Sequence, residues 1–140
     1  MNEAAFSIHT DGGARGNPGP AACAFVAEEN SVVVYKASKF LGRETNNLAE
    51  YHGVILALEW INKDPGTFSG KGIIFFLDSE LVVRQLKGIY KIKNPKLLDL
   101  HLKARKLIDN SGAKIDFVHV PRNKNKLADF LVNSELDKSA

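Results

Sequence analysis

One stretch near the start of the chain reads Phe6-Ser-Ile-His-Thr-Asp-Gly-Gly-Ala-Arg-Gly-Asn-Pro-Gly-Pro20, and the expected fold is built outward from it. Side chains alternate in character from Phe6 to Asp11, which is typical of a half-buried strand. Four glycines and two prolines follow, so we expect the strand to end at Asp11 and a tight loop to begin. The strand then delivers the Asp11 carboxylate to a loop whose backbone N–H groups an anion can approach closely. An ordinary Asp-Gly turn is the alternative, but such a turn needs only two of these residues.

The composition indicates one globular domain, residues 1–140 with a core of about 5–137. The 140 residues are 44% hydrophobic and 25% charged, which is ordinary for such a domain. No apolar run approaches the roughly 18 residues of a membrane span, and Met1–Phe6 lacks the basic and apolar regions of a signal peptide. The single cysteine, Cys23, lies in an apolar run and is expected to be a small core residue. We therefore expect a cytoplasmic monomer without a membrane partner.

The positive charge is small but unevenly placed. Lysine and arginine number 19 against 16 acidic residues, a net charge of +3. Residues 81–98 contain five basic side chains and no acid, and residues 119–126 contain three more basic side chains and again no acid. Such runs are often only solvated faces; here they indicate a polyanionic partner such as nucleic acid.

Hydrophobic periodicity and turn residues predict nine elements in the order β-β-β-α-β-α-α-β-α. Strands are expected over residues 5–11, 21–28, 31–41, 72–78 and 114–119, and helices over 47–62, 80–87, 95–109 and 125–136. Glu29-Asn30 is the predicted hairpin turn, and Gly42–Glu44 is interpreted as a linker. A strand–helix–strand crossover makes its two strands parallel. The predicted fold is therefore α/β, a five-stranded mixed sheet with three antiparallel strands and then two parallel to the first, flanked by about four helices.

Four acidic residues occupy comparable points in this scheme. Asp11 and Asp78 end strands, whereas Glu50 and Asp129 each lie about one turn into a helix. At about 100° per residue, Glu50 falls at the edge of its helix's apolar stripe, so it is expected to face the sheet without being buried in the core. A solvated surface glutamate is the alternative. The apolar run 72–78 is typical of a strand covered on both faces.

The predicted topology brings these acids to one edge of the sheet, where they would repel each other unless cations neutralised them. Hard oxygen ligands that leave room for water and phosphate suit Mg²⁺, or Mn²⁺ in its place. Two such ions roughly 3.5–4 Å apart can activate a water and stabilise a leaving oxygen in phosphodiester cleavage. The sequence has no P-loop, no Gly-x-Gly-x-x-Gly motif and no zinc pattern. Ser79 beside Asp78 is expected to cap a helix rather than act as a nucleophile.

In combination, four motifs resemble type 1 ribonuclease H. They are Asp11-Gly-Gly-Ala-Arg-Gly-Asn-Pro-Gly-Pro, Thr45-Asn-Asn-Leu-Ala-Glu-Tyr51, Phe76-Leu-Asp-Ser79 and His119-Val-Pro-Arg-Asn-Lys-Asn-Lys-Leu-Ala-Asp129. The resemblance runs from about Phe6 to Asn133 and implies a ribonuclease H-like fold. It also implies an endoribonuclease that cuts the RNA strand of RNA–DNA hybrids with two metal ions, leaving 5′-phosphate and 3′-hydroxyl ends.

The resemblance assigns roles to individual residues. The metal-binding carboxylates it implies are Asp11, Glu50, Asp78 and Asp129. His119 matches a family histidine that assists proton movement or product release; the alternative is a packed residue that ends the fifth strand.

Substrate contacts are expected beside the acids. Backbone groups near Gly12, Ala14 and Gly16 are expected to approach ribose 2′-hydroxyls, the short amides of Asn17, Asn46 and Asn47 to reach the minor groove, and Arg15, Arg43 and Arg122 to contact phosphates. Each asparagine can instead serve as a turn or cap residue. Contacts of these kinds carry no base information, so little sequence preference is expected.

The chain also departs from the family pattern. Glu80 follows Asp78-Ser79 where the family often has an amide, so an acid there is expected to weaken hybrid binding. The segment Gly88–Lys96 is short, so the basic protrusion of some family members is expected to be reduced here to Lys87, Lys91, Lys93 and Lys96. No separate hybrid-binding domain is expected before the catalytic one. Two other functions stay open: a related nuclease that cuts another duplex such as double-stranded RNA, and a catalytically silent module that only binds hybrids.

Overall fold

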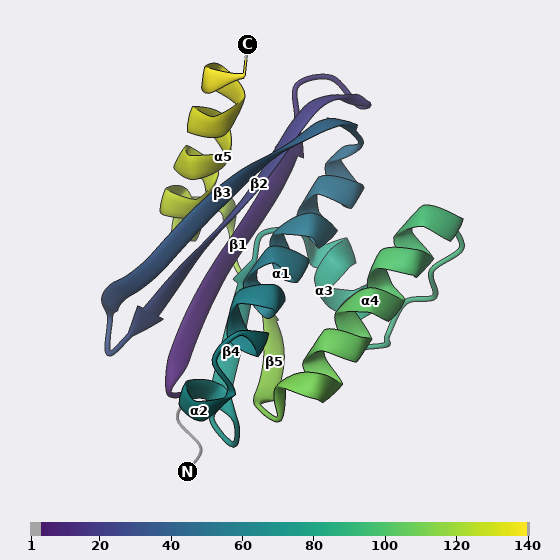
Figure 1. Ribbon diagram of the computed structural model, residues 1–140. Helices are drawn as coiled ribbons and strands as arrows, with labels where there is room; N and C mark the ends of the chain where they lie inside the picture. The colour runs from purple at the N-terminus through teal and green to yellow at the C-terminus, as the bar shows by residue number, and fades with distance from the viewer. Residues whose placement is uncertain (1–3, 140) are drawn as a thin grey trace.

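The computed structural model describes residues 4–139, and these build one five-stranded mixed sheet (Figure 1). The strands are β1 (Phe6–Ala14), β2 (Gly19–Glu29), β3 (Val32–Glu44), β4 (Gly72–Leu77) and β5 (Lys114–His119). They lie in the order β3-β2-β1-β4-β5, with β1, β2 and β3 antiparallel and with β4 and β5 parallel to β1. The predicted fold class is confirmed. Met1–Glu3, half of the segment inspected for a signal peptide, lie outside the described residues.

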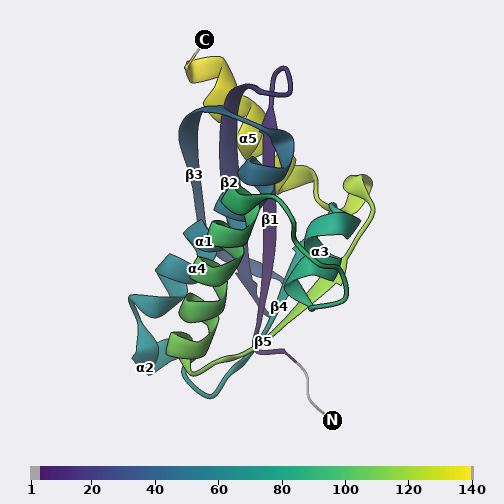
Figure 2. The same cartoon turned by 90° about the vertical axis from the view of Figure 1, so that its right-hand side faces the viewer.

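Helices cover both faces of this sheet (Figures 1 and 2). They are α1 (Asn46–Asn62), α2 (Pro65–Phe68), α3 (Glu80–Leu86), α4 (Pro95–Ser111) and α5 (Lys126–Lys138), with a 3-10 turn at Arg122–Lys124. Helix α1 packs on β1, β2 and α4, and α5 packs on β1, β2 and β3 from the opposite side. The one-turn helix α2 was not predicted; it forms because the Asp64 carboxylate accepts hydrogen bonds from Thr67 and Pro65 opens the turn.

Two apolar cores hold the layers together. The larger lies under α1 and α4, and all six apolar residues of the α1 stripe are buried in it: Leu48, Tyr51, Val54, Ile55, Leu58 and Ile61. The smaller lies under α5 and consists of Ala22, Ala24, Val132 and Leu136. Alanines on β2 have short side chains, so they let α5 lie close to the sheet. Cys23 between them is fully buried, as predicted.

The antiparallel strands are longer than predicted. Strand β1 continues through Gly12 and Gly13, which pair with Cys23 and Ala22 of β2, so the loop is only residues 15–18. A glycine-rich segment can remain extended when a neighbouring strand pairs with it, which is why the prediction that the strand ends at Asp11 was wrong. Likewise, Gly42–Glu44 is not a linker but the paired end of β3.

Two further expectations are corrected. The β2–β3 turn is Asn30-Ser31, with φ of 52° and 64°, rather than Glu29-Asn30. Strand β4 buries Ile73, Phe75 and Leu77, but its other side chains are only half-buried. Among residues 4–139, α5 packs mainly on β1, β2 and β3, and the half-burial of Ile74 and Phe76 shows that β4 is not fully covered on both faces. Within residues 4–139, no helix combines the length and the apolar character needed to cross a membrane.

Candidate active site

Parallel pairing of β1 and β4 places two carboxylates side by side. His9 of β1 pairs with Phe76 of β4, and Asp11 and Asp78 each lie two residues beyond these partners. Since both strands run in the same direction, both carboxylates emerge at the same edge of the sheet. Beyond Asp78, Ser79 caps α3, and its hydroxyl accepts a hydrogen bond from the Val82 N–H.

Two glycines bring α1 into backbone contact with β1 beside Asp11. A Cβ atom added to Gly12 would lie 2.1 Å from the Ala49 carbonyl oxygen, and one added to Gly53 would lie 2.7 Å from the Asp11 carbonyl oxygen. The helix can approach so closely only because neither position carries a side chain. Glu50 therefore faces the sheet beside Asp11, as expected, but it is more buried than expected, with only 7% of its surface exposed.

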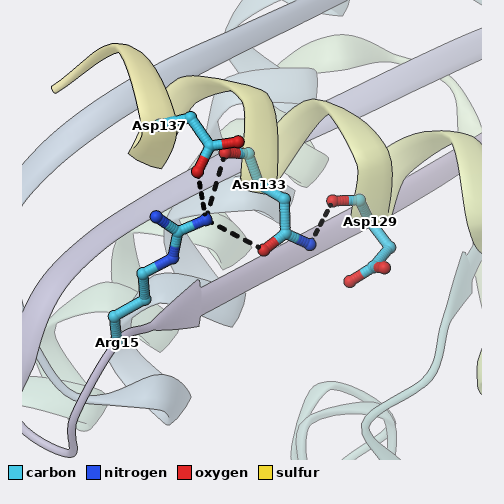
Figure 3. Close-up of polar contacts among 4 residues, drawn as sticks. All are labelled: Arg15, Asp129, Asn133 and Asp137. Atoms are coloured by element: carbon cyan, nitrogen blue, oxygen red, sulfur yellow. Dashed lines mark hydrogen bonds and ion pairs between the residues drawn. The ribbon is translucent and has the colours of Figure 1, made fainter. Parts of the chain in front are cut away.

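The four acids line one cavity of about 490 Å³. One carboxylate oxygen each from Asp11, Glu50 and Asp78 lies within 4.8 Å of the others. Asp129 lines the same cavity. It projects from α5 (Figure 3), which covers the opposite face of the sheet from α1 (Figures 1 and 2). The other predicted site residues on the wall of this cavity are Gly12, Ala14, Arg15, Asn46, Asn47 and Arg122.

The residues present fit a hard divalent cation. Their ligand atoms are all carboxylate oxygens, which Mg²⁺ and Mn²⁺ accept. Oε2 of Glu50 is buried and has no hydrogen-bond partner among residues 4–139. A buried carboxylate oxygen without a donor is costly, and a cation coordinated there would remove that cost.

Burial and the repulsion between neighbouring carboxylates shift Asp11 and Glu50 toward their protonated forms. The pKa of Asp11 is raised from 3.8 to about 7, mainly by burial and then by the Asp78 charge, while hydrogen bonds with the Glu50 side chain and the Gly12 backbone partly offset the rise. Burial, followed by the charges of Asp11 and Asp78, raises the pKa of Glu50 well above its ordinary value. A cation that binds here must displace these protons, so we expect metal affinity to rise with pH.

We expect the same shift to appear in the stability of the metal-free protein. The folded state binds the Asp11 proton more tightly than the unfolded state does, so this group's contribution to stability is present at low pH and is lost as pH rises through about 7. His9, His52 and His101 have pKa values lowered by burial and act in the opposite direction, so the variant Asp11→Asn is the reference.

Urea unfolding in EDTA measures this contribution. We expect Asp11→Asn to become more stable relative to the original chain by on the order of 2 kcal/mol between pH 5 and pH 8. A stability difference that stays constant across this range would show that the Asp11 pKa is not raised.

Asn125 is a site residue that the sequence interpretation missed. Its side chain is 1% exposed, and its Nδ2 donates a 2.9 Å hydrogen bond to the Thr10 carbonyl oxygen, next to Asp11. This bond ties the start of α5 to β1 and so helps to place Asp129. An asparagine before a helix signals a cap, but the Asn125 side chain makes no cap hydrogen bond to the described part of α5. Nothing local in the sequence indicates a partner 115 positions away.

Two of the asparagines predicted to contact the substrate form hydrogen bonds within the protein. Oδ1 of Asn46 accepts a 2.8 Å hydrogen bond from the Ala14 N–H, and Oδ1 of Asn17 accepts one of 3.0 Å from the Asn46 N–H. The Ala14 N–H is therefore not available to a ribose hydroxyl. Thr45 caps α1, which leaves the Asn46 and Asn47 amide groups on the cavity wall.

Other predicted site residues lie outside the wall of this cavity. Gly16 and Asn17 are exposed in the loop, and Arg43 is exposed on β3. His119 pairs with Leu77 at the end of β5 and lines a neighbouring hollow with Glu80 and other residues. Glu80 forms an ion pair of 3.3 Å with Arg84 one turn along α3.

Comparisons with known proteins agree with this geometry. A family model described as reverse transcriptase-like matches residues 9–135. LC11-RNase H1, a protein isolated from compost and solved in complex with an RNA/DNA hybrid, is 39% identical with a TM-score of 0.91; the match covers 96% of this chain and 98% of that one. RNase H1 from the archaeon Halobacterium salinarum is 36% identical with a TM-score of 0.87, covering 95% and 98% of the two chains.

Curated relatives are longer than this chain. The bifunctional protein Rv2228c of Mycobacterium tuberculosis is 38% identical over 135 residues, which are 95% of this chain and 36% of that protein. Ribonuclease HI of Halobacterium salinarum is 38% identical over 128 residues, and the chain spans 62% of its length. Because these matches take in nearly all of the sheet and both helices that carry acids, the chain belongs to the type 1 ribonuclease H family.

Proposed function

We propose that this chain is an endoribonuclease that hydrolyses the RNA strand of RNA–DNA hybrids with little sequence preference, leaving 5′-phosphate and 3′-hydroxyl ends. The observation that carries the proposal is the group of Asp11, Glu50 and Asp78 oxygens within 4.8 Å, in a cavity that Asp129 also lines. The hybrid bound to LC11-RNase H1 supports the choice of substrate. We assign the activity to a cytoplasmic monomer, in which Cys23 is a buried free thiol.

In this proposal the four carboxylates hold two Mg²⁺ ions, or Mn²⁺ in their place. When bound, such ions supply an activated water and stabilise the leaving oxygen in phosphodiester hydrolysis. The buried, unpartnered Oε2 of Glu50 supports coordination on the side of the cavity formed by α1. Because the pKa of Asp11 is raised to about 7, roughly half of these carboxyls are protonated near pH 7 unless a cation is bound, and ionisation is complete only at higher pH.

The chain's other residues bind and orient the substrate. Arg15 and Arg122 on the cavity wall are assigned to phosphates, as is Arg43 on the exposed end of β3. The amide groups of Asn46 and Asn47 are assigned to the minor groove and its 2′-hydroxyls, which distinguish RNA from DNA. His119, beside the cavity at the end of β5, is assigned to proton movement or product release.

A panel of end-labelled duplexes tests the proposal. RNA–DNA hybrid, double-stranded RNA and double-stranded DNA are incubated with the protein in Mg²⁺, in Mn²⁺ and in EDTA. We expect cleavage of the RNA strand of the hybrid alone, and only with a divalent ion. Cleavage of double-stranded RNA in preference to the hybrid would identify a different nuclease, and metal-dependent hybrid binding without turnover would identify a silent binding module.

A further inference from the structure

Arg15 on the cavity wall is already paired with an acid of the same chain (Figure 3). Its Nη2 lies 2.6 Å from Oδ1 of Asp137, in the last turn of α5. The same nitrogen makes longer contacts of 3.4 and 3.5 Å with the backbone and side-chain oxygens of Asn133. Asp137 is therefore the dominant partner, since hydrogen bonds weaken near 3.5 Å.

The ion pair orients the Arg15 side chain and places the negative charge of Asp137 directly beside its positive charge. All of its contacts to Asp137 and Asn133 use Nη2, so the N–H groups of Nε and Nη1 remain for another acceptor. Both side chains are exposed, Arg15 by 45% and Asp137 by 69%. An exposed pair of this kind contributes little to stability. Its larger effect is on the charge that an incoming phosphate meets at this wall.

We propose that Asp137 is an affinity-determining residue that weakens substrate binding by neutralising the charge of Arg15. The inference depends on the proposed function, because it takes the polyanion in the cavity to be an RNA–DNA hybrid. Removing the Asp137 charge while keeping an acceptor at that position leaves Arg15 in place with its full charge. The variant Asp137→Asn does this, because the asparagine Oδ1 can still accept the Nη2 hydrogen bond.

A double-mutant cycle tests the inference. Hybrid affinity is measured by fluorescence anisotropy in Mg²⁺ at several KCl concentrations, with Asp11→Asn as the uncleaving parent. Asp137→Asn is made in this parent and, separately, in the parent that also carries Arg15→Gln. Asp109→Asn is the charge-matched control, because Asp109 is exposed near the end of α4 and does not line the cavity.

We expect Asp137→Asn to lower the hybrid Kd about three- to fivefold at low salt. The size of this change is limited by the small interaction energy of an exposed ion pair. This gain should shrink as salt screens the charges and should disappear in the Arg15→Gln background. If Asp137→Asn tightened binding equally in the Arg15→Gln background, or if Asp109→Asn tightened binding as much as Asp137→Asn does, the effect would come from long-range charge. Either result would overturn the inference. Unchanged hybrid binding by Asp137→Asn would also overturn it. Weaker binding together with a lowered unfolding temperature would overturn it too, because it would show that the ion pair serves to hold α5 in place. A parent that binds no hybrid would overturn the proposed function, and this inference with it.

Discussion

Replacing Asp11 with asparagine is expected to reduce cleavage of RNA–DNA hybrid by about 10³-fold or more while the fold stays intact. The substitution keeps the volume of the side chain but removes one of three carboxylates that lie within 4.8 Å of one another. Metal ions supply several kcal/mol of transition-state stabilisation, and each 1.4 kcal/mol is about tenfold in rate. Single-turnover cleavage of labelled hybrid measures the loss, and circular dichroism checks the fold.

The charge-matched control for this prediction is Asp109→Asn on α4, which should cleave at the normal rate because Asp109 does not line the cavity. Isothermal titration with Mg²⁺ should show weakened binding for Asp11→Asn and normal binding for the control. Near-normal Mg²⁺-dependent cleavage by Asp11→Asn would remove Asp11 from the proposed metal ligands.

The variant Gly12→Ala is expected to lose about 3 kcal/mol of unfolding free energy and most of its activity together. The added Cβ would lie 2.1 Å from the carbonyl oxygen of Ala49 and 2.5 Å from the amide nitrogen of Glu50. Both are backbone atoms of α1, so the helix must move away from β1. Overpacking of this kind typically costs 1–3 kcal/mol and at times more. The same movement withdraws Glu50 from Asp11.

Gly13→Ala is the matched control, because it makes the same chemical change one position along the same strand. Its added Cβ would lie 4.0 Å from its nearest neighbours, side-chain atoms of Asn46 and Val132. We expect this variant to stay within about 1 kcal/mol of the original chain, the range of a substitution without a clash. Urea unfolding and hybrid cleavage are measured for both variants. If both were equally stable and active, the close contact between α1 and β1 would not be what positions Glu50.

Most of the fold could be predicted from the sequence, because the signals that set it act over few residues. The apolar stripe of α1 and the cap at Ser79 depend on neighbours within four positions, and the structure contains both. The α/β pattern then restricted the topology, since crossover connections have one usual hand. The elements that were missed or misplaced, α2 and the extended end of β1, depend on a local cap and on a pairing strand that periodicity does not reveal.

Part of the candidate site could likewise be predicted from the sequence, and part could not. The four acids could be selected as a set from the sequence, because each stands at the end of a strand or one turn into a helix of a recognisable motif. The sequence therefore determined which side chains are available for metal binding and roughly where in the fold they lie. It also identified Arg15 as a cationic group beside them.

Only the tertiary structure decided how those side chains are held. The burial of Glu50 depends on two glycines that let α1 touch β1. The Asn125–Thr10 hydrogen bond and the Arg15–Asp137 ion pair join residues 115 and 122 positions apart. Short-range patterns carry no information about such contacts, because distant residues meet only when the sheet and its helices have packed. Burial, pKa shifts and charge pairing are properties of that packing, so they could be determined only from the folded structure.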